Sequence, residues 1–140
     1  PGQIQRYMNK ISGPLLDRID IQCEISPVPF KDISKAAPGE PSANIRERVI
    51  KAREIQANRF KDFKGIHCNA QMTERMIHQC AEPTEEGINR LRMAMEKLSL
   101  SARAYNRILK VARTIADLAG CENVEPQHLA EAIGYRTLDR

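Results

Sequence analysis

Residues 101–120 read SARAYNRILKVARTIADLAG, and this stretch decides the fold. At about 100° per residue, its basic side chains fall on one stripe of a helix, at Arg103, Arg107 and Lys110. Its apolar side chains share the opposite face, at Tyr105, Ile108, Ala112, Ile115 and Ala119. Ser101 is suited to cap the first turn and Gly120 to end the last. The pattern therefore predicts a helix over 102–119 that packs with one side and presents positive charge on the other.

Four other stretches have the apolar spacing or the boundary residues of helices. They cover residues 43–60, 73–80, 84–98 and 126–135. Ser42 precedes the first as a capping residue, and Pro126 suits the first turn of the last, where its missing N–H costs nothing. Together with the helix over 102–119, these stretches predict a compact bundle of four or five helices.

The chain before this bundle has a different pattern. Apolar residues at 19, 21, 23 and 25 alternate with Asp20, Gln22 and Glu24, a period of two that predicts a half-buried strand. One strand is not stable alone, and no other segment has this pattern, so we expect its sheet partners to lie upstream. Because the first residue is Pro1 and not Met, we expect the chain to be part of a longer protein. Residues 1–25 are thus predicted to be the edge of another domain.

Residues 26–42 have the composition of a linker, with four prolines and a glycine, at Pro27, Pro29, Pro38, Gly39 and Pro41. We place the domain boundary here. The predicted organisation is therefore an edge segment over 1–25, a proline-rich linker over 26–42 and a helical domain over 43–140.

The 140-residue chain is 41% hydrophobic and 29% charged, which is typical of a globular domain. A net charge of +4 permits a phosphate-bearing partner without requiring one. No apolar run approaches the ~20 residues of a membrane span and no signal peptide opens the chain, so we expect a cytoplasmic protein without membrane contact. The four cysteines form no C-x-x-C pair, and we predict no metal site.

Arg18 is the first candidate for a functional side chain. It lies between a Gly-Pro turn and the predicted strand, in the sequence GPLLDRID over residues 13–20. An arginine at this position either forms an ion pair with Asp17 or Asp20 or is directed at a phosphate. The residues alone do not decide between these two interpretations.

Five segments resemble the C-terminal part of the magnesium-chelatase-like AAA+ ATPases, and most closely the bacterial competence-associated branch of that family. They are RYMNKISGPLLDRIDI at 6–21, GExS at 39–42, ARxxQxxR at 52–59, LSARAYNRILKVARTIADLA at 100–119 and YRTLDR at 135–140. The resemblance covers nearly the whole chain. It implies that residues 43–140 form the helical lid domain of such an ATPase and that 1–25 belong to its α/β core.

The same resemblance implies a hexameric ring in which the nucleotide lies between subunits. The Leu-Leu-Asp-Arg segment of the family carries the arginine finger, which corresponds to Arg18 here and would act in trans on the neighbouring subunit. The family's Ser-x-Arg at the start of a lid helix is the sensor-2 arginine, which corresponds to Arg103 with Ser101. The first turn of a helix favours phosphate, in agreement with this assignment.

Arg107, Lys110 and Arg113 receive no assignment from the family. They are candidates for contact with an adjacent subunit or with DNA, and a solvated helix face is the alternative. The chain contains neither a G-x-x-x-x-G-K-[ST] phosphate loop nor an acidic magnesium-binding strand. We therefore expect ATP and Mg²⁺ to be cofactors of the full-length protein, and this chain alone to bind neither and to be inactive.

Three functions agree with the sequence. The first is the lid and arginine-finger portion of an ATPase acting on DNA, because the competence-associated branch is linked to recombination, branch migration and DNA uptake. The second is an ATPase for magnesium insertion into porphyrin, the activity that names the wider family. The third is a non-enzymatic helical adaptor or DNA-binding module, whose DNA affinity would fall steeply with salt.

Overall fold

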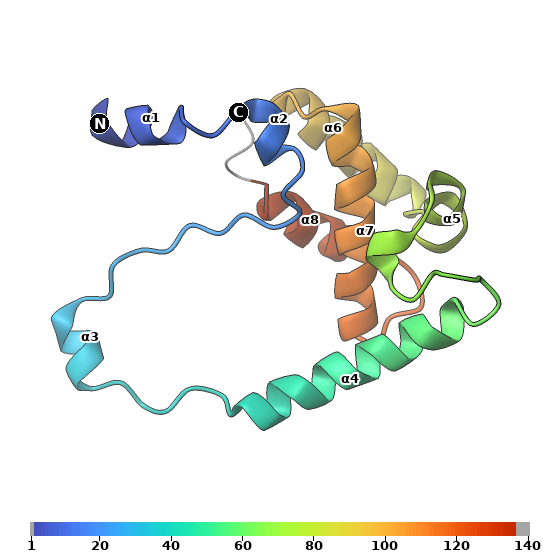
Figure 1. Cartoon of the computed structure of the whole chain (residues 1–140), viewed down its shortest axis with the longest axis horizontal. Coiled ribbons are helices and arrows are strands. Elements are labelled where there is room, and N and C mark those ends of the chain that lie inside the picture. The colour runs from blue at the N-terminus through green and yellow to red at the C-terminus, as the bar shows by residue number, and fades with distance from the viewer. Residues whose placement is uncertain (1, 137–140) are drawn as a thin grey trace.

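The computed structural model of the chain describes residues 2–136 and is mainly helical, as predicted (Figure 1). Two parts of the predicted segments lie outside the described residues. They are Pro1, the first residue of the segment 1–25, and residues 137–140, the last of the segment 43–140. The helices in chain order are α1 (Gly2–Met8), α2 (Gly13–Leu16), α3 (Phe30–Ser34), α4 (Ser42–Arg59), the 3-10 helix η1 (Asn69–Gln71), α5 (Glu74–Cys80), α6 (Glu85–Leu98), α7 (Ala102–Leu118) and α8 (Pro126–Gly134). The five helices expected from the sequence correspond to α4 to α8.

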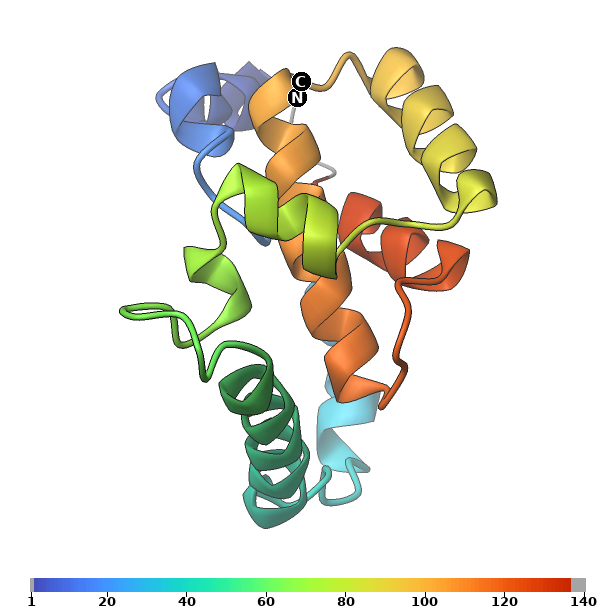
Figure 2. The same cartoon turned by 90° about the vertical axis from the view of Figure 1, so that its right-hand side faces the viewer.

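Helix α7 lies at the centre of the bundle, and α4, α5, α8 and η1 all contact it (Figure 2). Its buried face includes Ala104, Ile108, Leu109, Ala112 and Ala116, none more than 1% exposed. The predicted apolar face was correct at Ile108 and Ala112, whereas Ala119 lies beyond the end of the helix and is exposed. Helix α6 packs on α8, which completes the core on that side.

Side-chain caps fix the start of α5, α6 and α7. Thr73, Thr84 and Ser101 each accept a hydrogen bond from the backbone N–H three residues later, at 3.4, 3.2 and 3.2 Å respectively. Each cap satisfies one of the N–H groups that the first turn leaves without a helical partner. These polar residues explain why the boundaries of α5, α6 and α7 could be predicted to within about a residue.

The strand predicted over residues 19–25 is not formed within residues 2–136, where this segment is extended chain without a sheet. A strand requires a neighbour for its hydrogen bonds, and the described chain supplies none here. Instead, the Gln22 N–H donates to the Tyr135 carbonyl at 2.8 Å. Gln22 is 6% exposed while Ile21 is 53% exposed, so the polar residue is inside and the apolar one outside, opposite to the prediction.

Residues 23–51 are all exposed. They include the predicted proline-rich linker, in which the short helix α3 is the regular element described before Ser42 begins α4. The linker makes a wide excursion from the body of the molecule to the start of α4 (Figure 1). Helix α4 contacts α7 through its C-terminal half, where Ala52 and Gln56 are buried.

A buried carboxylate joins α4, η1 and α7. Asp117 accepts two hydrogen bonds from Arg59, at 2.5 and 2.8 Å, one from Asn69 at 2.8 Å and one from Arg113 at 3.2 Å. The hydrogen bond to Asp117 raises the pKa of Arg59, whereas burial lowers the pKa of Arg113. A single acidic side chain therefore compensates two guanidinium groups where water is excluded.

Replacing this carboxylate is expected to destabilise the fold strongly. Asp117→Ala should reduce the free energy of unfolding by about 3–5 kcal/mol, because it leaves the buried Arg113 charge without its counter-ion. Urea unfolding followed by circular dichroism measures the change. Glu86→Ala, which removes an exposed pair with Arg90, is the matched control and should change stability by less than about 1 kcal/mol. Equal losses in the two variants would contradict a structural role for Asp117.

Candidate functional site

The start of α7 is held against the segment that carries Arg18. The Ser101 hydroxyl donates a hydrogen bond to Asp17 Oδ2 at 3.1 Å and accepts one from the Ala104 N–H at 3.2 Å. One side chain thus caps the helix and connects it to a residue 84 positions earlier in the chain. Beside this bond lies a hollow of about 290 Å³, lined by Gly13, Pro14, Leu16, Asp17, Ser99, Leu100 and Ser101.

Local chemistry gives the Arg18 segment its shape. The Ser12 hydroxyl caps the single turn of α2 by accepting from the Leu15 N–H at 3.3 Å, and Pro14 lies in its first turn. Leu16 is buried against the bundle at 9% exposure. These contacts fix the backbone of α2, so that Arg18 follows a segment of defined conformation.

Arg136, near the C-terminal end of the described chain, binds the same Arg18 segment. Its side chain is buried, and it donates to the carbonyls of Ile19 at 3.0 Å and Asp17 at 3.4 Å. It also lies 4.0 Å from the Asp17 carboxylate. We did not identify this residue as functional from the sequence, where it appeared only within the YRTLDR segment. No local pattern reveals it, because its partners are more than 100 positions away.

Arg18 itself is exposed, and its guanidinium donates to the Pro14 carbonyl at 2.9 Å. It forms no ion pair with Asp17 or Asp20 among the described residues. Asp17 is engaged by Ser101 and Arg136, and Asp20 by Arg107. The ion-pair interpretation of Arg18 is therefore not realised, and its charge is available to another molecule.

Arg103 lies in the first turn of α7, two residues after the cap, and is exposed. It takes part in no ion pair or side-chain hydrogen bond within the part of the chain that the structure describes. The N-terminal turn offers backbone N–H groups and the positive end of the helix dipole, both of which favour a phosphate. Arg18 and Arg103 are thus two uncompensated cations on segments joined by the Asp17–Ser101 hydrogen bond.

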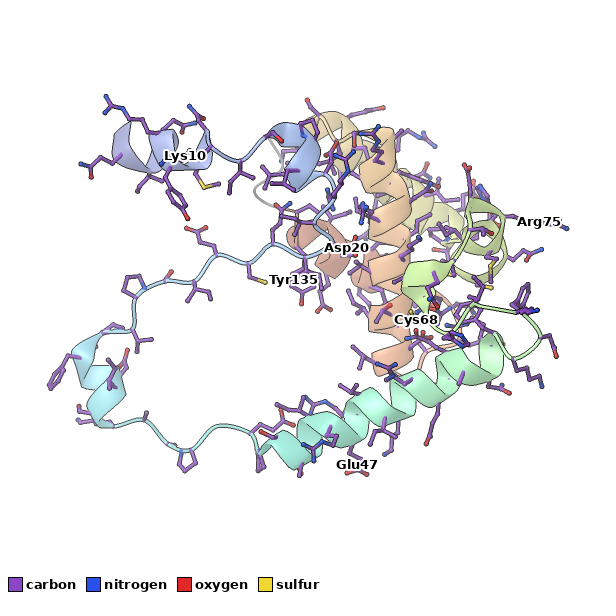
Figure 3. All side chains as sticks on the ribbon, in the orientation of Figure 1. Lys10, Asp20, Glu47, Cys68, Arg75 and Tyr135 are labelled. Carbon is purple, nitrogen blue, oxygen red and sulfur yellow. The ribbon has the colours of Figure 1, made fainter. Side chains whose placement is uncertain are left out.

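The other predicted cations of α7 are already engaged within the chain. Arg107 pairs with Asp20 at 2.5 Å, beside α7 in Figure 3, and Lys110 donates to the Ala70 carbonyl at 3.0 Å. Arg113 is 3% exposed and donates to the carbonyls of Cys121 and Glu122 at 2.8 and 2.7 Å. The structure contradicts both interpretations of Arg113, as a candidate for contact with a subunit or DNA and as part of a solvated face. It is buried on the packed side of α7, where the end of α5 and the chain after α7 meet.

Within residues 2–136, no group of three or more His, Cys, Asp or Glu side chains is close enough to hold a metal ion. The four cysteines are not in disulfides, and Cys23 is exposed. None of the helices described is long and apolar enough to span a bilayer.

Two family profiles match the chain. Residues 39–136 match the C-terminal region of magnesium chelatase subunit ChlI, and residues 1–33 match magnesium chelatase subunit ChlI. The first match includes all of α4 to α8, and the second includes Arg18. The boundary between the matches lies within the predicted linker.

Several proteins are similar over the whole chain or nearly so. Competence protein ComM of Haemophilus influenzae is 43% identical over 141 residues, which is 100% of this chain and 27% of that protein. An uncharacterized protein, YifB of Escherichia coli, is 42% identical over the same share of both chains. An uncharacterized protein of Mycobacterium bovis is 35% identical over 94% of this chain and 26% of its own length. The chain thus spans about a quarter of the length of these curated relatives.

Removing the Ser101 hydroxyl is expected to loosen the Arg18 segment. Ser101→Ala should reduce the free energy of unfolding by about 1–3 kcal/mol, because it removes both the cap of α7 and the bond to Asp17. Hydrogen exchange should show faster exchange of amides 15–22. Thr84→Ala removes only the cap of α6 and is the matched control. Unchanged protection of amides 15–22 in Ser101→Ala would show that Ser101 does not hold this segment.

Proposed function

Because the chain belongs to the magnesium chelatase subunit ChlI family, we propose that it is the lid and arginine-finger portion of a hexameric AAA+ ATPase that acts on DNA in the cytoplasm. The observation that carries this proposal is the pair of exposed cations, Arg18 and Arg103, on two segments joined by the Asp17–Ser101 hydrogen bond. The resemblance to the competence-associated branch supports DNA as the partner, and one relative is named a competence protein.

Arg18 acts as the finger on ATP bound to the neighbouring subunit. A guanidinium presents a planar fork of N–H donors, which match the oxygens of the γ-phosphate and neutralise the charge that develops there during transfer. Its accessibility and the fixed backbone before it support this role. Asp17 and Asp20 are held by other partners, so neither competes with phosphate for the guanidinium.

Arg103 acts as the sensor of the nucleotide at the start of α7. Its position in the first turn combines an exposed cation with the positive end of a 17-residue helix. ATP and Mg²⁺ are bound chiefly by the part of the full-length protein that carries a phosphate loop, which this chain lacks. Because Ser101 connects α7 to the finger segment, a shift of α7 on nucleotide binding displaces Arg18 as well.

The rate of ATP hydrolysis by the full-length protein tests the proposal. Branched DNA should stimulate hydrolysis, and Arg18→Ala should lower the stimulated rate by about 10³–10⁵, the usual contribution of an arginine finger. Arg18→Lys keeps the charge but not the fork and should also be slow. Arg92→Ala, an exposed arginine of α6 that bonds only to Asn89 among the described residues, is the control and should leave the rate unchanged.

Two outcomes would contradict the proposal in different ways. An unchanged rate in Arg18→Ala would remove Arg18 from catalysis. A hydrolysis rate that does not respond to DNA would instead favour the metal-insertion activity after which the family is named.

A further inference from the structure

The C-terminal half of α4, the loop after it and the start of α5 form a basic surface that the proposed ATPase chemistry does not use. We call it the Phe63 patch, which consists of Arg53, Lys61, Phe63, Lys64 and Arg75. Phe63 is 43% exposed and lies between two hollows of about 540 and 620 Å³. Arg53 and Lys61 line the first hollow, and Lys64 and Arg75 line the second. The loop projects from the body in Figure 2, and Arg75 points outward in Figure 3.

The positive charge of this patch is only partly offset within the described chain. All four basic side chains are exposed, and none of them belongs to an ion pair of residues 2–136. Two acidic residues, Glu54 and Asp62, line the same hollows. By contrast, Arg48 and Lys51 on α4 pair with Glu40 and Glu47. The excess of cations therefore favours a partner with negative charge on both sides of Phe63.

The Phe63 ring is exposed but fixed in place. It makes a T-shaped contact with the ring of Phe60, with the two centroids 6.4 Å apart and the planes at 78°. Phe60 is only 2% exposed and belongs to the core. A turn holds the backbone, with the Ile66 N–H donating to the Phe63 carbonyl at 3.3 Å and Gly65 at a φ of +81°. An aromatic ring held in this way loses little conformational entropy when a flat group stacks on it.

We propose that the Phe63 patch binds single-stranded DNA. An unpaired base stacks on Phe63, and the flanking phosphates contact the basic side chains of the two hollows. Single strands offer exposed base faces alternating with phosphates, which matches an aromatic side chain between two basic hollows. Duplex DNA keeps its bases stacked and would use the cations alone. The inference rests on the proposed function, since it names the strand and the surface through which the ATPase engages DNA.

Binding of a fluorescent oligothymidylate of about 20 nucleotides to the full-length protein tests the patch. Phe63→Ala should weaken binding roughly 5-fold or more, from the usual contribution of stacking one base. Phe63→Leu keeps an apolar side chain over Phe60 but lacks the aromatic face, and it should lose the same affinity while remaining folded. The triple variant Arg53→Ala, Lys61→Ala, Lys64→Ala should reduce the slope of log affinity against log salt by about 2.

A matched control separates the patch from overall charge. The triple variant Arg90→Ala, Arg92→Ala, Lys97→Ala removes the same charge from exposed positions of α6 and should keep its affinity within about twofold. A second readout is direct: photocrosslinking of an oligonucleotide that carries 5-bromodeoxyuridine should label the peptide that contains Phe63. Basal ATP hydrolysis should stay unchanged in all of these variants.

The outcomes distinguish the patch from the wider proposal. Three results would each overturn the inference. They are full affinity for single-stranded DNA in both Phe63 variants, equal losses of affinity for duplex and single-stranded DNA in those variants, and crosslinks only outside the patch. If DNA stimulates hydrolysis while the Phe63 variants bind single-stranded DNA normally, the proposed role of the Phe63 patch is wrong and the proposed function stands. If the Phe63 peptide crosslinks to the oligonucleotide but DNA never stimulates hydrolysis, DNA binding by the Phe63 patch is supported and the proposed ATPase role on DNA is wrong.

Discussion

The arrangement of α4, η1 and α7 depends on the hydrogen bonds that the buried Asp117 carboxylate accepts. It accepts hydrogen bonds from Arg59 of α4, Asn69 of η1 and Arg113 of its own helix. Taking these charges out of water costs free energy, which only a nearly complete set of partners offsets. Arg113 meets this condition by donating also to carbonyls of the chain that follows α7. Directional hydrogen bonds thus add to apolar packing in holding α4 against α7.

Helix α7 connects the two surfaces that we propose to act on nucleotide and DNA. Ser101 and Arg103 lie at its N-terminus, and Asp117 near its C-terminus holds the end of α4, from which the Phe63 loop departs. The 17 residues of α7 span about 25 Å. One continuous helix therefore connects the first turn that carries Arg103 with Arg59 and the loop after α4. The same rigid element thereby links both proposed surfaces to the Arg18 segment.

Local periodicity and capping residues predicted α4 to α8, because apolar spacing and Ser or Thr caps are properties of consecutive residues. Helices α2, α3 and η1 were not predicted, since so short a segment carries too little pattern. Helix α1 was not predicted because it has no buried face, whereas the equally short α5 has a Thr cap and buried residues. Arg113 was misplaced because its angular position lies between the two faces. The signal that could have placed it inside was Asp117 one turn later, together with Arg59 on another predicted helix. The strand over 19–25 failed because a strand depends on neighbours that its own sequence does not contain.

The same contrast between local and distant interactions explains the state of Arg18. Judged by sequence distance, Asp17 and Asp20 are its natural partners, yet both carboxylates bind residues more than 80 positions away, Ser101 and Arg107. Asp17 and Arg18 lie in the turn that ends α2, and the tertiary fold brings Ser101 and Arg107 to face the carboxylates of Asp17 and Asp20. An exposed guanidinium loses little by remaining hydrated, so the fold leaves Arg18 without a compensating charge at low cost. Tertiary contacts on both of its acidic neighbours thus keep this cation available for negative charge on another molecule.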